Sequence, residues 1–237
     1  RYLPFVHKPI KGEWPFIEYF LRHIFQEQYE LGLDYIKLLI ERPTQKLPVI
    51  CVVSKERNTG KTTLLLFFKM IFGGNMTINT NEDFKSSFNS EWIAKLLIGV
   101  DGTFLDRKKD SERLKNLSTA KLYKAEAKGQ DRIEVEFFGK FILCSNNEDG
   151  FLIIEPGETR YWVIKVKPFE KEIENFLEKL KLEIPYFLDA LINRPLSSEN
   201  ESRMWFNPKL LETSALKNVI RRSRSKLEFE ILNIMLS

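Results

Sequence analysis

The stretch Cys51-Val52-Val53-Ser54-Lys55-Glu56-Arg57-Asn58-Thr59-Gly60-Lys61-Thr62-Thr63 decides the fold of this 237-residue chain. It ends a short, apolar, β-branched run over residues 47–53, which predicts a buried strand. A helix-forming run over residues 64–72 follows it and stops at Gly73-Gly74. A strand, a loop containing Gly-Lys-Thr and a helix in this order is the context that predicts a phosphate-binding P-loop.

In a P-loop, backbone N–H groups and the helix N-terminus surround the phosphates, a Lys reaches the β- and γ-phosphates, and the next hydroxyl binds Mg²⁺. Lys61 and Thr62 fit these two roles. Lys55 stands where the full motif has its first Gly, so the loop is expected to have a negative φ there. The alternative interpretation is a chance Gly-Lys-Thr in an ordinary loop. The predicted nucleotide-binding residues are Asn58, Thr59, Gly60, Lys61, Thr62 and Thr63.

The composition is that of an ordinary globular protein, with 43% apolar and 30% charged residues. No apolar run is long enough to cross a bilayer and no signal peptide is present, so no membrane partner is expected. Cys51 and Cys144 lie in apolar, strand-like runs, which predicts buried, reduced thiols in a cytoplasmic protein. The chain starts without Met and ends in helix-like sequence, so we expect a fragment of a longer protein.

A second apolar run, over residues 94–101, ends in Asp101 and has the form of a Walker B strand, whose Asp supports Mg²⁺. Catalysis normally needs a further acid to orient the attacking water, often at the next position. That position is Gly102, and Asp106 is the nearest alternative. The competing interpretation is a strand that ends in an ordinary Asp turn.

Two more strand-like runs end or begin in polar residues. Residues 140–145 precede Asn146, which could bind the γ-phosphate or the water, because open α/β sheets hold ligands at the carboxyl ends of their strands. Arg160 begins the run over residues 160–166 and could act as an arginine finger on a neighbour's nucleotide. An ordinary Asn turn and a structural salt bridge are the respective alternatives.

The net charge of +4 is mild, but the basic residues are clustered. The first cluster covers a helix predicted over residues 107–118 and a β-hairpin predicted over residues 123–138, with residues 128–131 as its turn. Such patches favour phosphate backbones over the alternative of solvated helix faces. The clusters are Arg107, Lys108, Lys109, Arg113, Lys115, Lys121, Lys124 and Lys128, and Arg203, Lys209, Lys217, Arg221, Arg222, Arg224 and Lys226.

Helical patterns flank these motifs. Apolar residues recur at spacings of three and four over residues 14–41, with Gly32 as the expected break between two helices. A helix is predicted over residues 169–194 and a small helical pair over residues 208–237. Residues 75–90 are polar, with turn signals and one short helix.

These patterns together predict an α/β protein, a P-loop NTPase core with a central parallel sheet between helical segments. The expected division is a helical lead-in or collar over residues 1–46, the ATPase core over 47–168 and a C-terminal helical segment over 169–237.

The order of the motifs resembles the superfamily 3 helicases, and within them the phage and plasmid primase-helicase type with a poxvirus-like ATPase domain. The resemblance covers about residues 47–168. It rests on Gly60-Lys61-Thr62-Thr63 for Walker A, Leu97-Ile98-Gly99-Val100-Asp101 for Walker B, Phe141-Ile142-Leu143-Cys144-Ser145-Asn146-Asn147 for the sensor motif and Thr159-Arg160-Tyr161-Trp162 for the downstream Arg motif.

This resemblance implies a modified AAA-like core that assembles as a homo-hexameric ring and hydrolyses ATP with Mg²⁺ between subunits. Lys61, Asp101 and Asn146 would be catalytic, with Arg160 supplied in trans, and Thr62 and Asp101 would hold the metal.

The resemblance also implies a partner and a setting. Lys115, Lys121 and Lys128 would contact single-stranded DNA in the central channel. A primase domain would lie N-terminal to this chain, and the setting would be DNA replication in the cytoplasm of a bacterial host. We expect Lys128→Ala to weaken single-stranded DNA binding and to leave nucleotide affinity unchanged.

Two other functions stay open from the sequence. Gly102 motivates a nucleotide-binding assembly module with little or no hydrolysis, in which ATP promotes oligomerisation. The P-loop alone also allows a small-molecule phosphotransferase, against which the two basic clusters argue.

Overall fold

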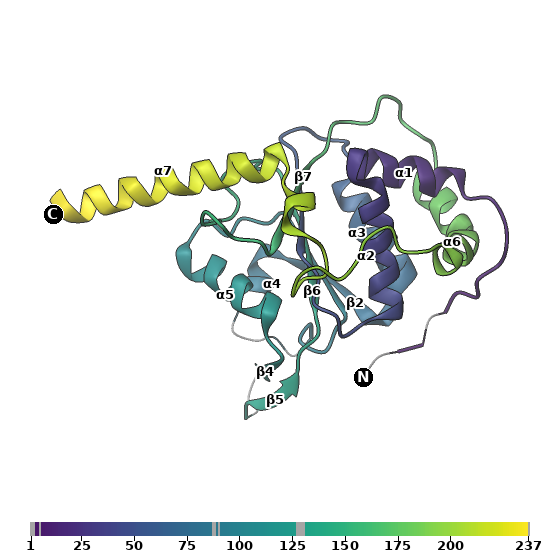
Figure 1. Cartoon of the computed structure of the whole chain (residues 1–237), viewed down its shortest axis with the longest axis horizontal. Coiled ribbons are helices and arrows are strands. Elements are labelled where there is room, and N and C mark those ends of the chain that lie inside the picture. The colour runs from purple at the N-terminus through teal and green to yellow at the C-terminus, as the bar shows by residue number, and fades with distance from the viewer. Residues whose placement is uncertain (1–2, 5, 87–88, 90, 127–130, 237) are drawn as a thin grey trace.

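A five-stranded parallel sheet lies at the centre of the computed structural model (Figure 1). The structure describes residues 3–4, 6–86, 89, 91–126 and 131–236. The strand order is β2-β3-β6-β1-β7, and β4 and β5 form a separate antiparallel hairpin. The strands are β1 (Val49–Val53), β2 (Met76–Thr80), β3 (Leu97–Asp101), β4 (Leu122–Ala125), β5 (Ile133–Glu136), β6 (Lys140–Ser145) and β7 (Tyr161–Lys165).

Helices cover both faces of this sheet. The α-helices are α1 (Pro15–Phe25), α2 (Tyr29–Glu41), α3 (Lys61–Phe72), α4 (Asn81–Lys85), α5 (Lys108–Thr119), α6 (Phe176–Asn193) and α7 (Ser214–Leu236). Three 3-10 turns join them, η1 (Gln26–Gln28), η2 (Gly73–Asn75) and η3 (Pro208–Leu211). Figure 1 shows α1, α2 and α6 grouped on one side and α7 extending away from the body on the other.

The strands send alternate side chains into two hydrophobic cores, as the period of two in a strand requires. On β1, Ile50 and Val52 enter the core formed with α1, α2, α3 and α6. Cys51 and Val53 enter the opposite core, formed with α4, α5 and the start of α7. Strands buried on both faces are nearly continuous apolar runs, which confirms the prediction of a central parallel sheet.

The strand order determines which strand ends lie together. Strand β6 lies between β1 and β3, so the end of β6 separates the loop after β1 from Asp101 at the end of β3. Because the strands are parallel, all three carboxyl ends lie at the same edge of the sheet.

The predicted basic helix and hairpin are present as α5 and the β4–β5 pair. Lys46 holds the two ends of the hairpin region near the sheet. Its amine donates to the carbonyl oxygens of Ala120, after α5, and of Phe137, after β5 (2.9 Å for the latter). The predicted hairpin turn falls largely on residues 127–130, so Lys128 lies outside the described residues.

The prediction that Gly32 separates two helices is wrong. Gly32 lies inside α2, and the chain breaks instead at η1, where Gln26 has φ 50°. A Cβ on Gly32 would stand 2.4 Å from Cδ2 of the buried Phe25. The glycine is therefore required for close packing rather than for a turn.

Three other element predictions need correction. Strand β2 lies within the segment over residues 75–90, for which only turns and one short helix were predicted. The sequence did not indicate this strand, because only two of its five residues are buried. Helix α6 begins at Phe176 rather than at residue 169, after Asn175 with φ 52°. The C-terminal pair is one short 3-10 turn and one long helix, α7.

Candidate functional site: a phosphate-binding loop at the carboxyl edge of the sheet

The loop after β1 enters α3 at Gly60, which has φ 86° in the left-handed region that favours glycine. A Cβ at this position would also lie 3.0 Å from Cζ of Phe169 and 3.1 Å from Cε2 of Phe20. The left-handed backbone therefore favours glycine here, and the two rings would have to shift slightly to admit a side chain. The helix then starts at Lys61, so its free N–H groups face the loop.

The amine of Lys61 is folded into the loop. It donates to Thr59 Oγ1 (3.0 Å), to the carbonyl oxygen of Glu56 (3.2 Å) and to that of Ser54 (3.3 Å). Burial lowers the pKa of Lys61, while the Cys144 thiol and the carboxylates of Asp101 and Glu148 act to raise it. These three acceptors are neutral. A phosphate that took their place would form a stronger, charge-assisted hydrogen bond with the Lys61 amine.

Thr62 and Asp101 come together across the sheet edge. The Thr62 hydroxyl donates to Asp101 Oδ2 at 3.1 Å. Hydroxyl and carboxylate oxygens are the ligands that Mg²⁺ prefers, and Mg²⁺ commonly takes its other ligands from water and substrate phosphates. The two predicted metal-binding residues therefore fit a magnesium ion carried in with a nucleotide.

Gly102 follows Asp101 in the left-handed conformation, with φ 68°. Its N–H donates to Asp101 Oδ1 at 3.0 Å. Among the described residues, apart from its two chain neighbours, no atom lies within 4 Å of the place a Cβ would take. Backbone conformation, not lack of space, therefore disfavours an acid at this position.

The two Asn residues after β6 differ in their surroundings. Asn147 closes a turn, because its Oδ1 accepts from the N–H of Gly150 at 2.9 Å. Asn146 is exposed just after the carboxyl end of β6, the strand that lies between the P-loop strand and the Asp101 strand. Asn146 is thus the member of the pair that faces solvent beside the loop.

Arg160 lies at the opposite edge of the sheet. It precedes β7, and its carbonyl oxygen accepts from the N–H of Val49 at the start of β1 (2.8 Å). Its guanidinium pairs with Glu158. Since the P-loop follows the other end of β1, Arg160 is remote from the P-loop of its own chain.

The predicted DNA contacts have different environments. The Lys115 amine pairs with Glu155 (3.1 Å) and Glu112 (3.4 Å), so a phosphate would compete with these carboxylates. Lys121 is exposed at the base of the hairpin.

Sequence reasoning missed Glu148. Its Oε1 accepts the N–H of Lys55 (3.1 Å) and its Oε2 pairs with the Lys165 amine (2.8 Å). Burial raises its pKa, but the bonds from Lys165 and Lys55 outweigh this and lower it overall. Glu148 thus anchors the loop where the motif's first glycine is absent. The sequence signal that could have identified Glu148 is its position shortly after the carboxyl end of β6, where open α/β sheets hold ligands.

His23, on α1, also contacts the loop. Its Nε2–H donates to the carbonyl oxygen of Thr59 (3.2 Å), and its ring stacks on Phe169 with centroids 4.0 Å apart. Burial lowers the pKa of His23, although hydrogen bonds to the carbonyls of Thr59 and Lys167 act against this. The helical lead-in therefore touches the P-loop directly.

Comparisons with known proteins agree with this architecture. Residues 52–160, less than half of the chain, match a family described as a family of unknown function (DUF5906). No curated protein matches the chain. The apo structure of the NrS-1 C-terminal region (305–718) has a TM-score of 0.77 at 19% identity, over 92% of this chain and 53% of that one. Its A form gives 0.75 at 20% identity, over 92% and 52%.

A ligand-bound JCV helicase is also similar, with a TM-score of 0.48 at 18% identity, over 92% of this chain and 62% of that one. The chain spans about half the length of the NrS-1 region. Fold and loop geometry together define the class: an α/β, AAA-like P-loop NTPase fold with a central parallel sheet. None of the described helices is long and apolar enough to span a membrane.

Proposed function

We propose that this chain is the ATP-dependent DNA helicase core of a phage or mobile-element primase-helicase, which moves along single-stranded DNA during replication. One observation carries the proposal: Lys61 at a helix N-terminus and the Thr62–Asp101 pair (3.1 Å) share one edge of a parallel sheet. This arrangement supplies a phosphate cradle, a cation for the phosphates and oxygen ligands for Mg²⁺.

Each proposed role follows from the chemistry of the residue. Lys61 would neutralise charge on the β- and γ-phosphates, and Thr62 with Asp101 would hold the Mg²⁺ that accompanies them. Asn146 senses the γ-phosphate from the end of β6. A metal held by Thr62 and Asp101 would supply positive charge beside the transferring phosphoryl group.

The position of Arg160 supports assembly as a ring. The P-loop and Arg160 lie at opposite edges of the sheet, so an Arg160 finger could act only on another subunit's nucleotide. A head-to-tail arrangement, in which one edge meets the next subunit's other edge, closes into a ring when the rotation allows it. The hexamer is proposed on this basis together with the resemblance to superfamily 3 helicases.

Nucleotide titration of a Lys61→Ala variant tests the phosphate site. We expect ATP binding with Mg²⁺ in the wild type and at least about tenfold weaker binding in the variant, because a charge-assisted contact to phosphate is lost. Lys181→Ala, at an exposed position of α6, is the control and should bind as the wild type does. Equal affinities for all three proteins would remove Lys61 from the site.

Single-stranded DNA binding tests the proposed channel. Lys121→Ala and Lys128→Ala should each weaken binding and flatten its dependence on salt, since each removed phosphate contact releases about one counterion fewer. ATP affinity should be unchanged in both variants. DNA affinity that stays at the wild-type value at low salt would remove these residues from the channel.

A second candidate function is a nucleotide-binding assembly module with little hydrolysis. It is favoured by Gly102, which stands directly after Asp101 where an acid would orient the attacking water, and whose φ of 68° disfavours an acid at this position. Size-exclusion mass that rises with ATP, together with phosphate release at the level of Lys61→Ala, would support this function over the first.

A further inference from the structure

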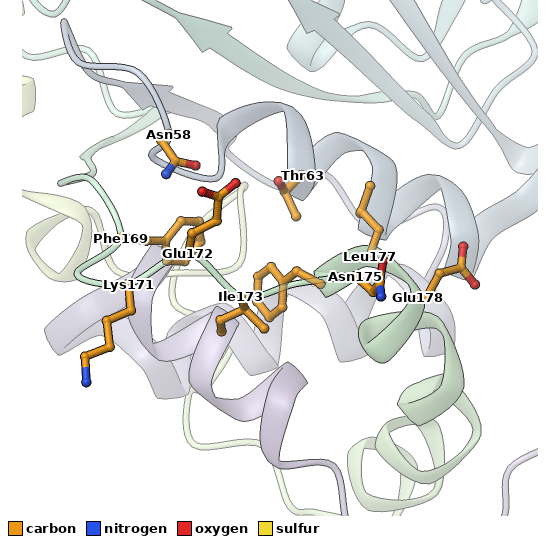
Figure 2. Close-up of a pocket in the computed structure, with 10 residues that line it drawn as sticks. Asn58, Thr63, Phe169, Lys171, Glu172, Ile173, Asn175, Leu177 and Glu178 are labelled. Carbon is orange, nitrogen blue, oxygen red and sulfur yellow. The ribbon is translucent and has the colours of Figure 1, made fainter.

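A cavity of about 390 Å³ opens beside the P-loop, between the first turn of α3 and the segment over residues 169–178 (Figure 2). Its size falls in the range of small-molecule sites, about 300–1,000 Å³. Its lining includes the apolar Phe169, Ile173 and Phe176 and the polar Asn58, Glu172 and Asn175. Figure 2 shows the Glu172 carboxylate between Asn58 and Thr63.

The cavity lies on the side of the helix start away from the metal ligands. Thr62 reaches Asp101, whereas the next residue, Thr63, lines the cavity. Successive residues of an α-helix are about 100° apart around its axis. Phosphates held at this helix N-terminus would therefore have the metal ligands on one side and the cavity on another.

The apolar wall of the cavity is fixed to the P-loop. The Phe169 N–H donates to the carbonyl oxygen of Asn58 at 3.0 Å, and Cζ of the Phe169 ring lies 3.0 Å from the place that a Cβ at Gly60 would take. The same ring stacks on His23 and meets Phe176 edge to face, with centroids 4.0 and 5.7 Å away. A ligand on this wall would thus have a defined position relative to the phosphate site.

Two asparagines form part of the polar rim. Asn58 and Asn175 have φ of 56° and 52°, which makes them two of the four non-glycine residues with positive φ in the described part of the chain. Asn tolerates this left-handed region better than most other residues do. The side-chain amides of both residues hydrogen-bond to no residue that the structure describes, so each offers a donor and an acceptor to a ligand.

We propose that this cavity holds the nucleoside of the bound nucleotide, with its base against Phe169, Ile173 and Phe176. The inference rests on the proposed function, because the triphosphate must lie in the P-loop. The amides of Asn58 and Asn175 could each donate to or accept from a polar atom of the base or the ribose. The cavity would therefore distinguish a nucleoside triphosphate from a bare polyphosphate.

The test compares Mg²⁺-ATP with inorganic tripolyphosphate by titration calorimetry on the 237-residue chain. Phe176→Ala removes part of the wall, and Ile173→Trp fills the cavity. Each should weaken ATP binding at least about fivefold, the lower end for a lost base-stacking contact, and leave tripolyphosphate binding unchanged. Ile192→Trp, at an exposed position on α6, is the matched control and should change neither.

The outcomes separate this inference from the proposed function. If both cavity variants bind ATP as tightly as the wild type does, or if they lose affinity for ATP and tripolyphosphate by the same factor, the nucleoside assignment is wrong while the phosphate site stands. If the wild type binds neither ligand, the phosphate site is wrong and the nucleoside assignment falls with it. Ile173→Trp removes no core side chain, so it remains informative if Phe176→Ala fails to fold in thermal melts.

Discussion

At the scale of single residues, backbone conformation and burial decide what each position can do. Gly60 and Gly102 both have positive φ, but only Gly60 also touches neighbouring rings. The sequence identified both glycines as important, the first as part of a motif and the second as a missing acid. It could not give the left-handed conformation of Gly102, which depends on how β3 ends.

Gly102→Glu should lower the free energy of unfolding by about 1 kcal/mol, because an L side chain in the left-handed region costs that much. Gly102→Asn is the matched control, since Asn tolerates this region. Urea titration of both variants measures the difference. Equal stability of the two variants would show that backbone strain does not disfavour an acid here.

Lys140 should make stability depend on pH. It is 2% exposed, and burial, with the Lys46 charge nearby, lowers its pKa from 10.5 to about 7. Between these values the unfolded chain holds a proton that the folded chain lacks, so stability contributed by this group rises with pH from about 7 upward.

Lys140→Met should remove that rise. Urea titrations at pH 7 and 9 should show the stability of the wild type increasing relative to the variant, by up to about 1.4 kcal/mol per pH unit. The carbonyls of Pro43 and Phe138, to which the amine donates, lose a partner in the variant at both pH values. If the free energies of unfolding of the wild type and the variant differed by the same amount at pH 7 and pH 9, the lowered pKa of Lys140 would be contradicted.

At the scale of elements, the strand–loop–helix unit and the strand ending in Asp101 could be predicted because each is local and strongly patterned. Strand β2 could not, because its half-exposed, polar residues resemble a turn. The cavity beside the P-loop was also beyond the sequence. Its walls come from residues 58–63 and 169–178, which only the folded chain brings together.

The anchoring of the P-loop by Glu148 predicts a change in proteolysis. Glu148→Ala removes the acceptor for the Lys55 N–H and should speed trypsin cleavage after Lys55 and Arg57, which are both exposed. Glu148→Gln keeps a carbonyl acceptor and should be cleaved more slowly than Glu148→Ala. Mass spectrometry of timed digests measures both, and identical digestion of the two variants would mean that the Lys55 bond does not restrain the loop.

At the scale of the whole molecule, the sheet separates two surfaces. On one, α1 contacts the P-loop through His23, and the segment before α6 with the first turn of α6 lines the cavity. Helix α5, the hairpin and α7 lie over the other face and carry much of the basic charge (Figure 1). A motor that couples nucleotide to DNA would have to transmit motion between these surfaces through the strand ends that hold Asp101 and Asn146.

Phosphate release from ATP with Mg²⁺, with and without single-stranded DNA, tests the central claim most directly. Lys61→Ala serves as the blank. We predict release above the blank that increases further when DNA is added. Release at the level of the blank in both conditions, by a chain that still binds ATP, would contradict the helicase proposal and leave the non-hydrolysing assembly module as the function of this fold.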